Sequence, residues 1–291
     1  MSELNTTNLP EKMHKKGMSE LGSKIFFATL LTILTICIIY PLLFTITTSF
    51  KTYAEFLKNP FSISFNHPEN YVTALVEGEI ITLLQNSLFV VVISVTGHVL
   101  SVCLISYAIG ILRFKGSDII MALMLSGMFL TSEVTSIPKI IMIREMNLLN
   151  TLWALIVPYV FSPGGMAVVL MANFMKRMPE EIIEAGELDG AGFGHLFFQI
   201  ILPMSMPIIA FTAIQQFNGI WNDFMWPLIA LARNQEVWTI PLGLIRFQGM
   251  NNSEYGELCA GLVIMMAPTI LIYACFSKYF LEGAAAGAVK G

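Results

Sequence analysis

The chain consists mainly of long apolar stretches separated by short polar segments. A transmembrane α-helix needs about 20 apolar residues in a row, and reading for such runs predicts about six membrane-spanning helices. The runs are continuous and lack the alternation of lipid-facing strands, so helices are expected instead of a β-barrel. The expected spans lie near residues 25–48, 85–111, 118–143, 151–174, 204–232 and 258–281.

The polar segments divide the chain into a tail at residues 1–24, a transmembrane domain at 25–281 and a second tail at 282–291. Two connections between spans are long. In the first, residues 69–79 predict a short helix at the membrane surface, with Tyr71 and Leu75 turned toward lipid. The second connection, residues 175–202, contains most of the sequence patterns discussed below.

Composition and charge fix the class and the expected orientation. Hydrophobic residues make up 55% of the chain, charged residues only 12%, and the mean hydropathy is +0.71, which is outside the range of soluble domains. With both termini in the cytoplasm, ten of the 16 Lys and Arg residues fall on the cytoplasmic side, as the positive-inside rule favours. We therefore expect an all-α, multi-pass membrane protein with cytoplasmic termini and a cytoplasmic loop at 175–202.

The four cysteines stand singly inside apolar runs. They are Cys37, Cys103, Cys259 and Cys275. Their spacing matches neither a metal site nor a disulfide framework. We interpret them as reduced packing residues.

The cytoplasmic loop has the pattern of two short helices joined by a glycine turn. Pro179 suits the first position of a helix, and Glu180 and Glu184 suit the positive end of its dipole. Gly190 breaks this helix, and Asp189 is placed to cap a second one that begins near Ala191. We expect small residues on the outer surface, where a partner can approach closely, and unusually apolar residues on the second helix. The small residues are Ala185, Gly186, Gly190, Ala191 and Gly192, and the apolar ones are Leu196, Phe197, Phe198, Ile200 and Ile201.

This loop resembles the EAA loop of ABC importer permeases, whose pattern is Glu-Ala-Ala, three residues, Gly, nine residues, Ile-x-Leu-Pro. Asp189, Gly190 and Ala191 form the Asp-Gly-Ala typical of the carbohydrate permeases. Gly186 replaces the second Ala of the pattern, and since Gly costs about 1 kcal/mol relative to Ala inside a helix, a slightly looser helix is expected. The matching residues are Glu184, Ala185, Gly190, Ile200, Leu202 and Pro203.

The resemblance extends over most of the chain and points to the maltose-type, oligosaccharide-importing branch. The matching segments come in the family's order: Asn86-Ser87, Ile137-Pro138, Leu148-Leu149-Asn150-Thr151, Trp221-Asn222-Asp223-Phe224, Trp226-Pro227-Leu228 and the small-residue tail from Gly283.

The resemblance implies a type I importer permease in a bacterial cytoplasmic membrane. The implied partners are a second homologous permease subunit, two ATP-binding subunits and an extracytoplasmic solute-binding protein, with the lipid bilayer around them and no nucleic acid. The loop around Glu180, Glu184, Ala185, Gly186, Asp189, Gly190 and Ala191 would dock on an ATP-binding subunit. The chain has no phosphate-binding Gly-x-x-x-x-Gly-Lys-Ser/Thr loop, so ATP and Mg²⁺ are expected on the partner chains, with no catalytic residue, metal or cofactor here.

Polar residues inside the spans are the candidates for a substrate path, because such groups are costly at membrane depth unless they are paired or line a cavity. Amides and a carboxylate beside an indole suit a sugar. The same residues also suit hydrogen bonds between helices. The candidates are Gln215, Gln216, Asn218, Trp221, Asn222, Asp223 and Glu133. We interpret His98 as a packing residue instead of a proton relay.

Two other classes remain open at this stage. An ion-coupled secondary transporter needs a chain of ionisable residues or paired broken helices, and Glu133 and His98 are isolated. An intramembrane enzyme or a simple membrane anchor is the other alternative, although no pair of acids, His-Glu-x-x-His or Gly-x-Ser-x-Gly motif marks a catalytic site.

Overall fold

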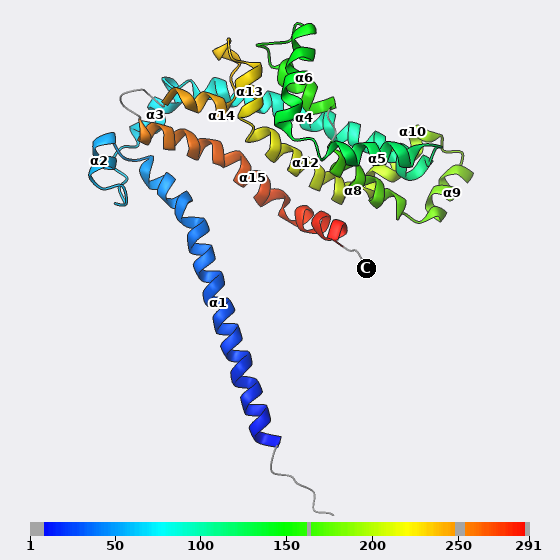
Figure 1. The fold of residues 1–291 in the computed structure, drawn as a ribbon, viewed down its shortest axis with the longest axis horizontal. Coiled ribbons are helices and arrows are strands. Elements are labelled where there is room, and N and C mark those ends of the chain that lie inside the picture. Colours follow the sequence, from blue (N-terminus) through cyan, green and yellow to red (C-terminus); the bar gives the residue numbers. More distant parts are fainter. Residues whose placement is uncertain (1–8, 162–163, 248–253, 289–291) are drawn as a thin grey trace, which may run out of the picture.

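A computed structural model describes residues 9–161, 164–247 and 254–288, without the side chains of residues 9–22, 132–133 and 279–288. The described residues form helices joined by short turns, with no strand among them (Figure 1). The expected all-α class is therefore confirmed.

The helices follow one another along the whole described chain. They are α1 (Leu9–Thr48), α2 (Tyr53–Lys58), α3 (Glu69–Val76), α4 (Ile80–Tyr107) with a π-helical extension η1 (Ala108–Leu112), α5 (Ser117–Gly127), α6 (Ser132–Glu145), α7 (Trp153–Phe161), α8 (Gly165–Lys176), α9 (Glu180–Leu188), α10 (Phe193–His195), a second π-helical segment η2 (Leu196–Ile201), α11 (Leu202–Met204), α12 (Met206–Trp221), α13 (Met225–Ala230), η3 (Gln235–Val237), α14 (Ile240–Gly243), η4 (Leu244–Phe247) and α15 (Tyr255–Ala288).

In the described part of the chain, three helices are long and apolar enough to cross a membrane. They cover Ser23–Thr48, Ile80–Leu112 and Tyr255–Lys278, which confirms long apolar helices at the first, second and sixth expected spans. Two bent pairs raise the number in the described residues to as many as five, if each pair is one span. One pair joins α7 to α8, and the other joins Phe193–Met204 to α12 through a bend of 77°.

The sequence prediction of continuous spans at 118–143 and 204–232 is wrong. The first breaks into α5 and α6, because Gly127 favours a helix end and Thr131, in an extended conformation, precedes the start of the next helix. The second stops at Trp221 and resumes as α13, where an Asp223 carboxylate oxygen accepts a hydrogen bond from the backbone N–H of Trp226 at 3.2 Å. Hydropathy averaged over 20 residues does not register such local breaks.

The short helix expected after the first span exists as α3, but its orientation differs from the prediction. Tyr71 and Leu75 pack against the core, and the Tyr71 hydroxyl forms a 2.8 Å hydrogen bond with the Ser49 hydroxyl. Val72 and Val76 are the exposed apolar residues of α3. The expectation that Tyr71 and Leu75 face lipid is therefore wrong.

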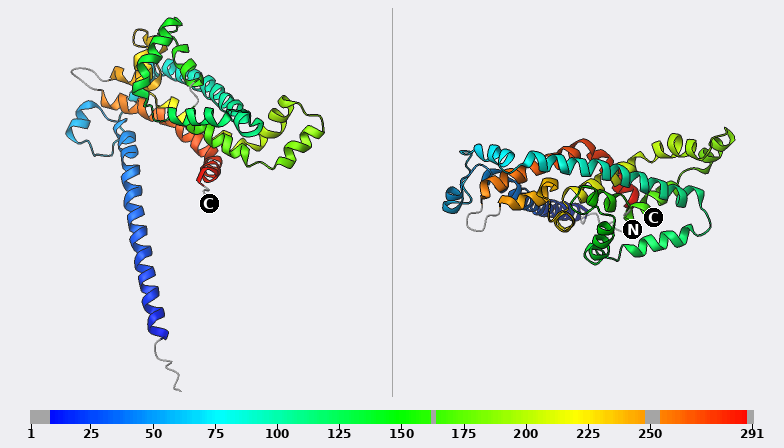
Figure 2. Two further views of the ribbon diagram at one scale, coloured as in Figure 1. Left: turned by 45° about the vertical axis from the view of Figure 1, so that its right-hand side comes forward. Right: turned by 90° about the horizontal axis from the view of Figure 1, so that it is seen from above.

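Two buried clusters hold the helices together, and α4, which runs along the bundle in Figure 2, contributes residues to both. The larger cluster joins α4 to α7, α12, α14 and α15 around Trp221. The smaller cluster joins the end of α4 and η1 to α8 and η2, around Tyr107, Met175 and Phe197. Because the smaller cluster lies directly beneath α9, it fixes the base of the loop that the sequence singles out.

Helix α1 extends away from the other helices (Figures 1 and 2). It packs against α15 near its C-terminal end, and the apolar window of its span has no buried residue. The molecule therefore presents a long apolar helix without cover from the rest of its own chain.

All four cysteines are free, in agreement with the sequence prediction of reduced thiols. Their environments differ, since Cys103 is buried whereas Cys37 and Cys275 are exposed. Only Cys103 therefore packs in an interior cluster.

Candidate functional site

The loop between α8 and α12, residues 177–205, contains the predicted pair of short helices, and we call it the α9–η2 loop. Its first helix, α9, begins after Pro179, which precedes the helix by one position, and carries Glu180 and Glu181 in its first turn. The acids thus lie at the positive end of the helix dipole, as predicted. The second helical stretch begins at Phe193, two residues after Ala191, but its N-cap is Gly192, so the expectation that Asp189 caps it is wrong.

Gly190 ends α9 in a Schellman motif. Its φ is +81°, a left-handed conformation that favours glycine. Its N–H donates to the Glu187 carbonyl at 3.0 Å, and the Ala191 N–H donates to the Gly186 carbonyl at 3.0 Å. These two bonds satisfy carbonyls that would otherwise be unpaired at the helix end. The left-handed backbone conformation therefore explains why glycine occupies this position of the pattern.

Gly186 faces inward and is buried, so the expectation that it lies on the outer surface is wrong. A Cβ atom at this position would lie 3.0 Å from the Ile200 Cδ1 and 3.3 Å from the Leu196 Cδ1. The missing methyl group lets α9 pack closely on η2. Gly186 thus tightens this contact, in contrast to the looser helix expected from its propensity alone.

Most apolar residues of η2 are buried and anchor the segment, and they do not form an exposed surface. Leu196, Phe197 and Ile201 are buried, and the Phe197 ring lies 5.1 Å from the Tyr107 ring at the end of α4. The Tyr107 hydroxyl also donates a hydrogen bond to the Phe193 carbonyl oxygen, at 3.4 Å. The prediction that the second helix exposes its apolar residues is confirmed only for Phe198, which is exposed.

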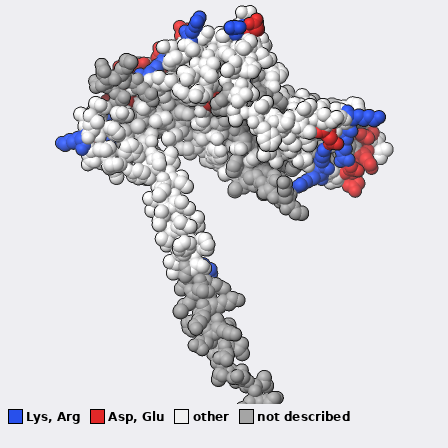
Figure 3. Space-filling model, in the orientation of Figure 1, with Lys and Arg blue, Asp and Glu red and all other residues white. Residues whose placement is uncertain are grey.

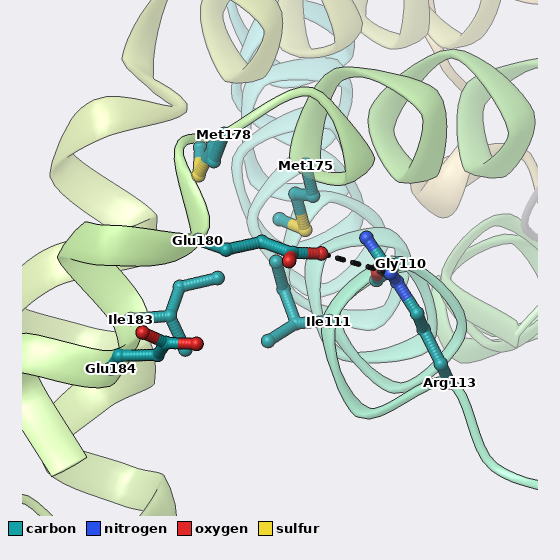
Figure 4. A pocket seen from close by; sticks show the side chains of 8 residues that line it. All are labelled: Gly110, Ile111, Arg113, Met175, Met178, Glu180, Ile183 and Glu184. Carbon is teal, nitrogen blue, oxygen red and sulfur yellow. Dashed lines mark hydrogen bonds and ion pairs between the residues drawn. The ribbon is translucent and has the colours of Figure 1, made fainter.

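An ion pair ties α9 to the end of η1 (Figure 4). The Arg113 guanidinium lies 3.1 Å from the Glu180 carboxylate and also donates to the Gly110 carbonyl through Nε at 3.3 Å. Arg113 has a φ of +44°, in the left-handed region, where the chain turns out of η1. These groups border a pocket of about 180 Å³, lined further by Ile111, Met175, Met178, Ile183 and Glu184.

The tip of the α9–η2 loop is apolar and open. Leu188 is 87% exposed and Phe193 is 74% exposed, whereas Ala185, Glu184 and Asp189 surround them as exposed small or acidic residues. Figure 3 shows charged side chains gathered around α9 and at the far edges of the molecule, with a broad uncharged surface between. The loop therefore combines a fixed base with two unprotected apolar side chains.

Two of the substrate-path candidates, Asn222 and Asp223, lie just after α12 at an open cleft. Asn222, Asp223 and Gly219 line an open cleft of about 660 Å³ between α6 and α13, together with Ser136, Lys139, Phe224, Met225, Trp226 and Ile229. We call it the α6–α13 cleft. Asn222 is exposed and donates to the Asn218 carbonyl and side-chain oxygens, both at 2.9 Å. The Lys139 ammonium lies 4.7 Å from the centre of the Trp226 ring.

The Trp221 indole donates to the Met265 carbonyl of α15 at 3.0 Å, and the Trp226 indole binds a backbone carbonyl that a proline leaves without its usual partner. Pro158 has no N–H for the Ala154 carbonyl four residues earlier, and the Trp226 indole donates to that oxygen at 3.1 Å. Such substitute donors allow prolines inside membrane helices. This geometry supports a structural role for both indoles.

Tyr159 forms hydrogen bonds with other polar side chains of this region. Its hydroxyl donates to Asp223 Oδ2 at 2.7 Å. Its carbonyl lies in the last turn of α7, 3.4 Å from the Gln216 amide and 3.3 Å from the His98 ring nitrogen. His98 is buried, as expected of a packing residue, and Gln215 is exposed on α12. The Glu133 side chain lies outside the described residues, so its role stays a prediction.

Sequence reasoning did not find two features of these sites. The Arg113–Glu180 pair joins residues 67 positions apart, and the Tyr159 contacts span 57 to 64 positions. No periodicity links such residues along the chain. The only local signal for the first is the pair of basic residues Arg113 and Lys115 ahead of Gly116, at the end of an apolar run.

Comparison with known proteins places the chain in a family. Residues 87–282 match the model described as "Binding-protein-dependent transport system inner membrane component". The chain is 34% identical over 257 residues to the probable ABC transporter permease protein YurM of Bacillus subtilis, covering 88% of this chain and 85% of YurM. It is 31% identical over 267 residues to the multiple sugar-binding transport system permease protein MsmG of Streptococcus mutans, covering 90% and 95%.

A solved structure shows the same fold. The chain matches a bacterial ABC transporter involved in the import of the acidic polysaccharide alginate with a TM-score of 0.79, 21% identity and coverage of 90% of this chain and 98% of that chain. The family and the fold favour an ABC permease over an ion-coupled secondary transporter. This chain belongs to the family of binding-protein-dependent transport system inner membrane components, the permease subunits of ABC importers.

Proposed function

We propose that this chain is a permease subunit of an ATP-driven sugar or oligosaccharide importer, and that an ATP-binding subunit drives it through the α9–η2 loop. The observation that carries this proposal is the apolar tip at Leu188 and Phe193 on a firmly anchored base. Large exposed apolar side chains mark surfaces that a partner covers. The acidic residues around them, such as Glu184, add a charge for a basic partner surface.

The contacts of the loop give a route for the motion. Buried Leu196, Phe197 and Ile201 fix η2 against α4 and α8, and the chain continues through the 77° bend into α12. The Arg113–Glu180 pair adds a link to η1. A push on α9 would therefore move packed helices as rigid bodies instead of bending a loose loop.

A carbohydrate substrate is supported by the names of relatives. MsmG is named for multiple sugar binding, and the relative NgcG of Streptomyces coelicolor, 31% identical over 252 residues, is named as a diacetylchitobiose uptake system permease protein. The α6–α13 cleft of about 660 Å³ has the size of a small-ligand site and presents Asn222 beside apolar walls. Gln215, Gln216, Asn218 and Glu133 remain candidates for the path.

The proposed assembly contains a second homologous permease subunit, two ATP-binding subunits and an extracytoplasmic solute-binding protein in the bacterial cytoplasmic membrane. ATP and Mg²⁺ would bind to the ATP-binding subunits. The uncovered α1 span supports a second permease subunit, because it offers an apolar face that this chain does not bury. In this assembly both termini and the α9–η2 loop would face the cytoplasm.

The test uses the complete importer in proteoliposomes, with ATP hydrolysis measured with and without sugar-loaded binding protein. Glu184→Lys and Gly190→Val are expected to insert and assemble normally but to lose stimulated hydrolysis and uptake. Gly190→Val strains a left-handed position by about 1–2 kcal/mol. Gly192→Ala is the matched control, since Gly192 has an ordinary φ of −71° and open space around it. Normal coupling in both test variants would contradict the docking role.

A further inference from the structure

The end of α2 and the segment that joins it to α3 expose a row of large apolar side chains. Leu57, Phe61, Ile63 and Phe65 are 62%, 72%, 78% and 58% exposed. The transport mechanism proposed above assigns nothing to them. A patch of this kind on a folded segment indicates a surface that something apolar covers.

Apolar and polar side chains alternate along this segment, but their orientation is the reverse of that in a water-soluble protein. Phe61, Ile63 and Phe65 point outward, whereas Ser62 and Ser64 between them are half-buried. The Ser64 hydroxyl is buried without a hydrogen-bond partner in the described part of the chain. Apolar side chains outward and polar ones inward is the pattern of a lipid-facing surface.

The backbone of the segment is fixed, so the outward row is not a feature of a loose loop. The ammonium of Lys51, which is buried, donates to the Pro60 carbonyl at 2.7 Å. The His67 N–H donates to the Phe50 carbonyl at 3.1 Å, and the Asn70 amide donates to the Lys51 carbonyl at 2.9 Å. These bonds close the segment at both ends.

Ring contacts set the depth of the segment relative to the membrane. Phe44 belongs to the Ser23–Thr48 span, about one turn before its end. The Phe44 ring centre lies 6.0 Å from that of Phe61 and 6.3 Å from that of Phe56. Figures 1 and 2 show the segment beside this end of α1. The row therefore lies level with the last turn of a membrane helix.

We propose that residues 57–65 lie in the interfacial layer of the bilayer, with Leu57, Phe61, Ile63 and Phe65 inserted among the lipid acyl chains. The long side chain of the exposed Lys58 can then lie along the apolar layer and place its ammonium among the lipid headgroups. The segment anchors the end of α1 at a defined depth. This role does not depend on which sugar is carried or on docking through α9.

The experiment places an environment-sensitive fluorophore on single cysteines in a variant whose four native cysteines are alanine. Ile63→Cys and Leu57→Cys are the test positions, and Asn66→Cys, an exposed polar position next to the row, is the matched control. The labelled complete importer is reconstituted in liposomes with either ordinary or brominated phosphatidylcholine. ATP hydrolysis by the same sample confirms assembly.

The expected result is a blue-shifted emission at positions 63 and 57 that brominated lipid quenches and aqueous iodide does not. The probe at 66 should respond to iodide. Quenching by iodide at both test positions would overturn the proposal, because the row would face water. Resistance to both quenchers would also overturn it, because a protein subunit would then cover the row.

Discussion

At the residue scale, the Arg113–Glu180 pair is the contact whose role can be isolated most cleanly. Both side chains are more than half exposed, and such pairs contribute only about 0.2–1 kcal/mol to stability. We therefore expect Arg113→Glu to leave folding nearly unchanged but to lower sugar uptake per ATP hydrolysed, because α9 loses its link to η1. The double variant Arg113→Glu with Glu180→Arg should regain part of the coupling, limited by a cation at a helix N-terminus. Equal loss in the single and double variants would show that the pair itself is unimportant.

Asp223 is the second residue with a separable role. Its two carboxylate oxygens accept from the Tyr159 hydroxyl and from the Trp226 backbone. Asp223→Ala leaves these donors unpaired, so we expect a loss of about 1–3 kcal/mol in stability, seen as a lower unfolding temperature in detergent. Asn222→Ala, at an exposed neighbour, should change stability little. If Asp223→Ala unfolds normally yet abolishes uptake, Asp223 acts on the substrate instead.

At the element scale, His67 connects α2 and α3. Its ring lies 2.6 Å from Glu69 and 3.4 Å from Glu55, and the hydrogen bond to Glu69 is the main cause that raises the pKa of His67 above its usual value. The pKa of Glu55 is lowered, mainly by the Thr52 backbone, and that of Glu69 by its own backbone N–H. Between the lowered pKa values of the two carboxyl groups and the raised pKa of the imidazole, His67 is positively charged and Glu55 and Glu69 are negatively charged.

A histidine whose pKa is raised in the folded state contributes its full stabilisation below its unfolded pKa of about 6.5. This stabilisation is lost as the pH rises through the folded-state pKa. We expect the α2–α3 contact to loosen as the pH rises through the raised pKa of His67. Hydrogen exchange of α2 and α3 in the wild type, compared with His67→Gln at each pH, measures this. The exchange rates of the wild type and of His67→Gln should converge at alkaline pH. A ratio between them that stays constant with pH would contradict the assignment.

The elements also show what the sequence can predict. Spans at residues 25–48, 85–111 and 258–281 follow from continuous apolar runs, and the position of the turn at Gly190 follows from a single glycine. The breaks at Gly127 and after Trp221 were missed, because capping and side-chain bonds to backbone decide them locally. The inward orientation of Gly186 and Tyr71 depends on partners distant in sequence, which hydropathy does not specify.

At the scale of the whole molecule, the α9–η2 loop and α3 lie at opposite ends of the helical bundle (Figure 1). One core cluster supports each end, and α4 connects the two. This arrangement suits a protein that receives force at one end and changes its opening at the other. The same layout lets one position at each end serve as test and control in a single experiment.

The most direct test of this account is site-specific photo-crosslinking in the complete reconstituted importer. A photoreactive amino acid replaces Leu188 at the loop tip or, as the control, Val76 of α3, which is 67% exposed. The account predicts that position 188 crosslinks to the ATP-binding subunit and that position 76 does not. If position 188 fails to crosslink to the ATP-binding subunit, the loop is not the site through which ATP drives transport.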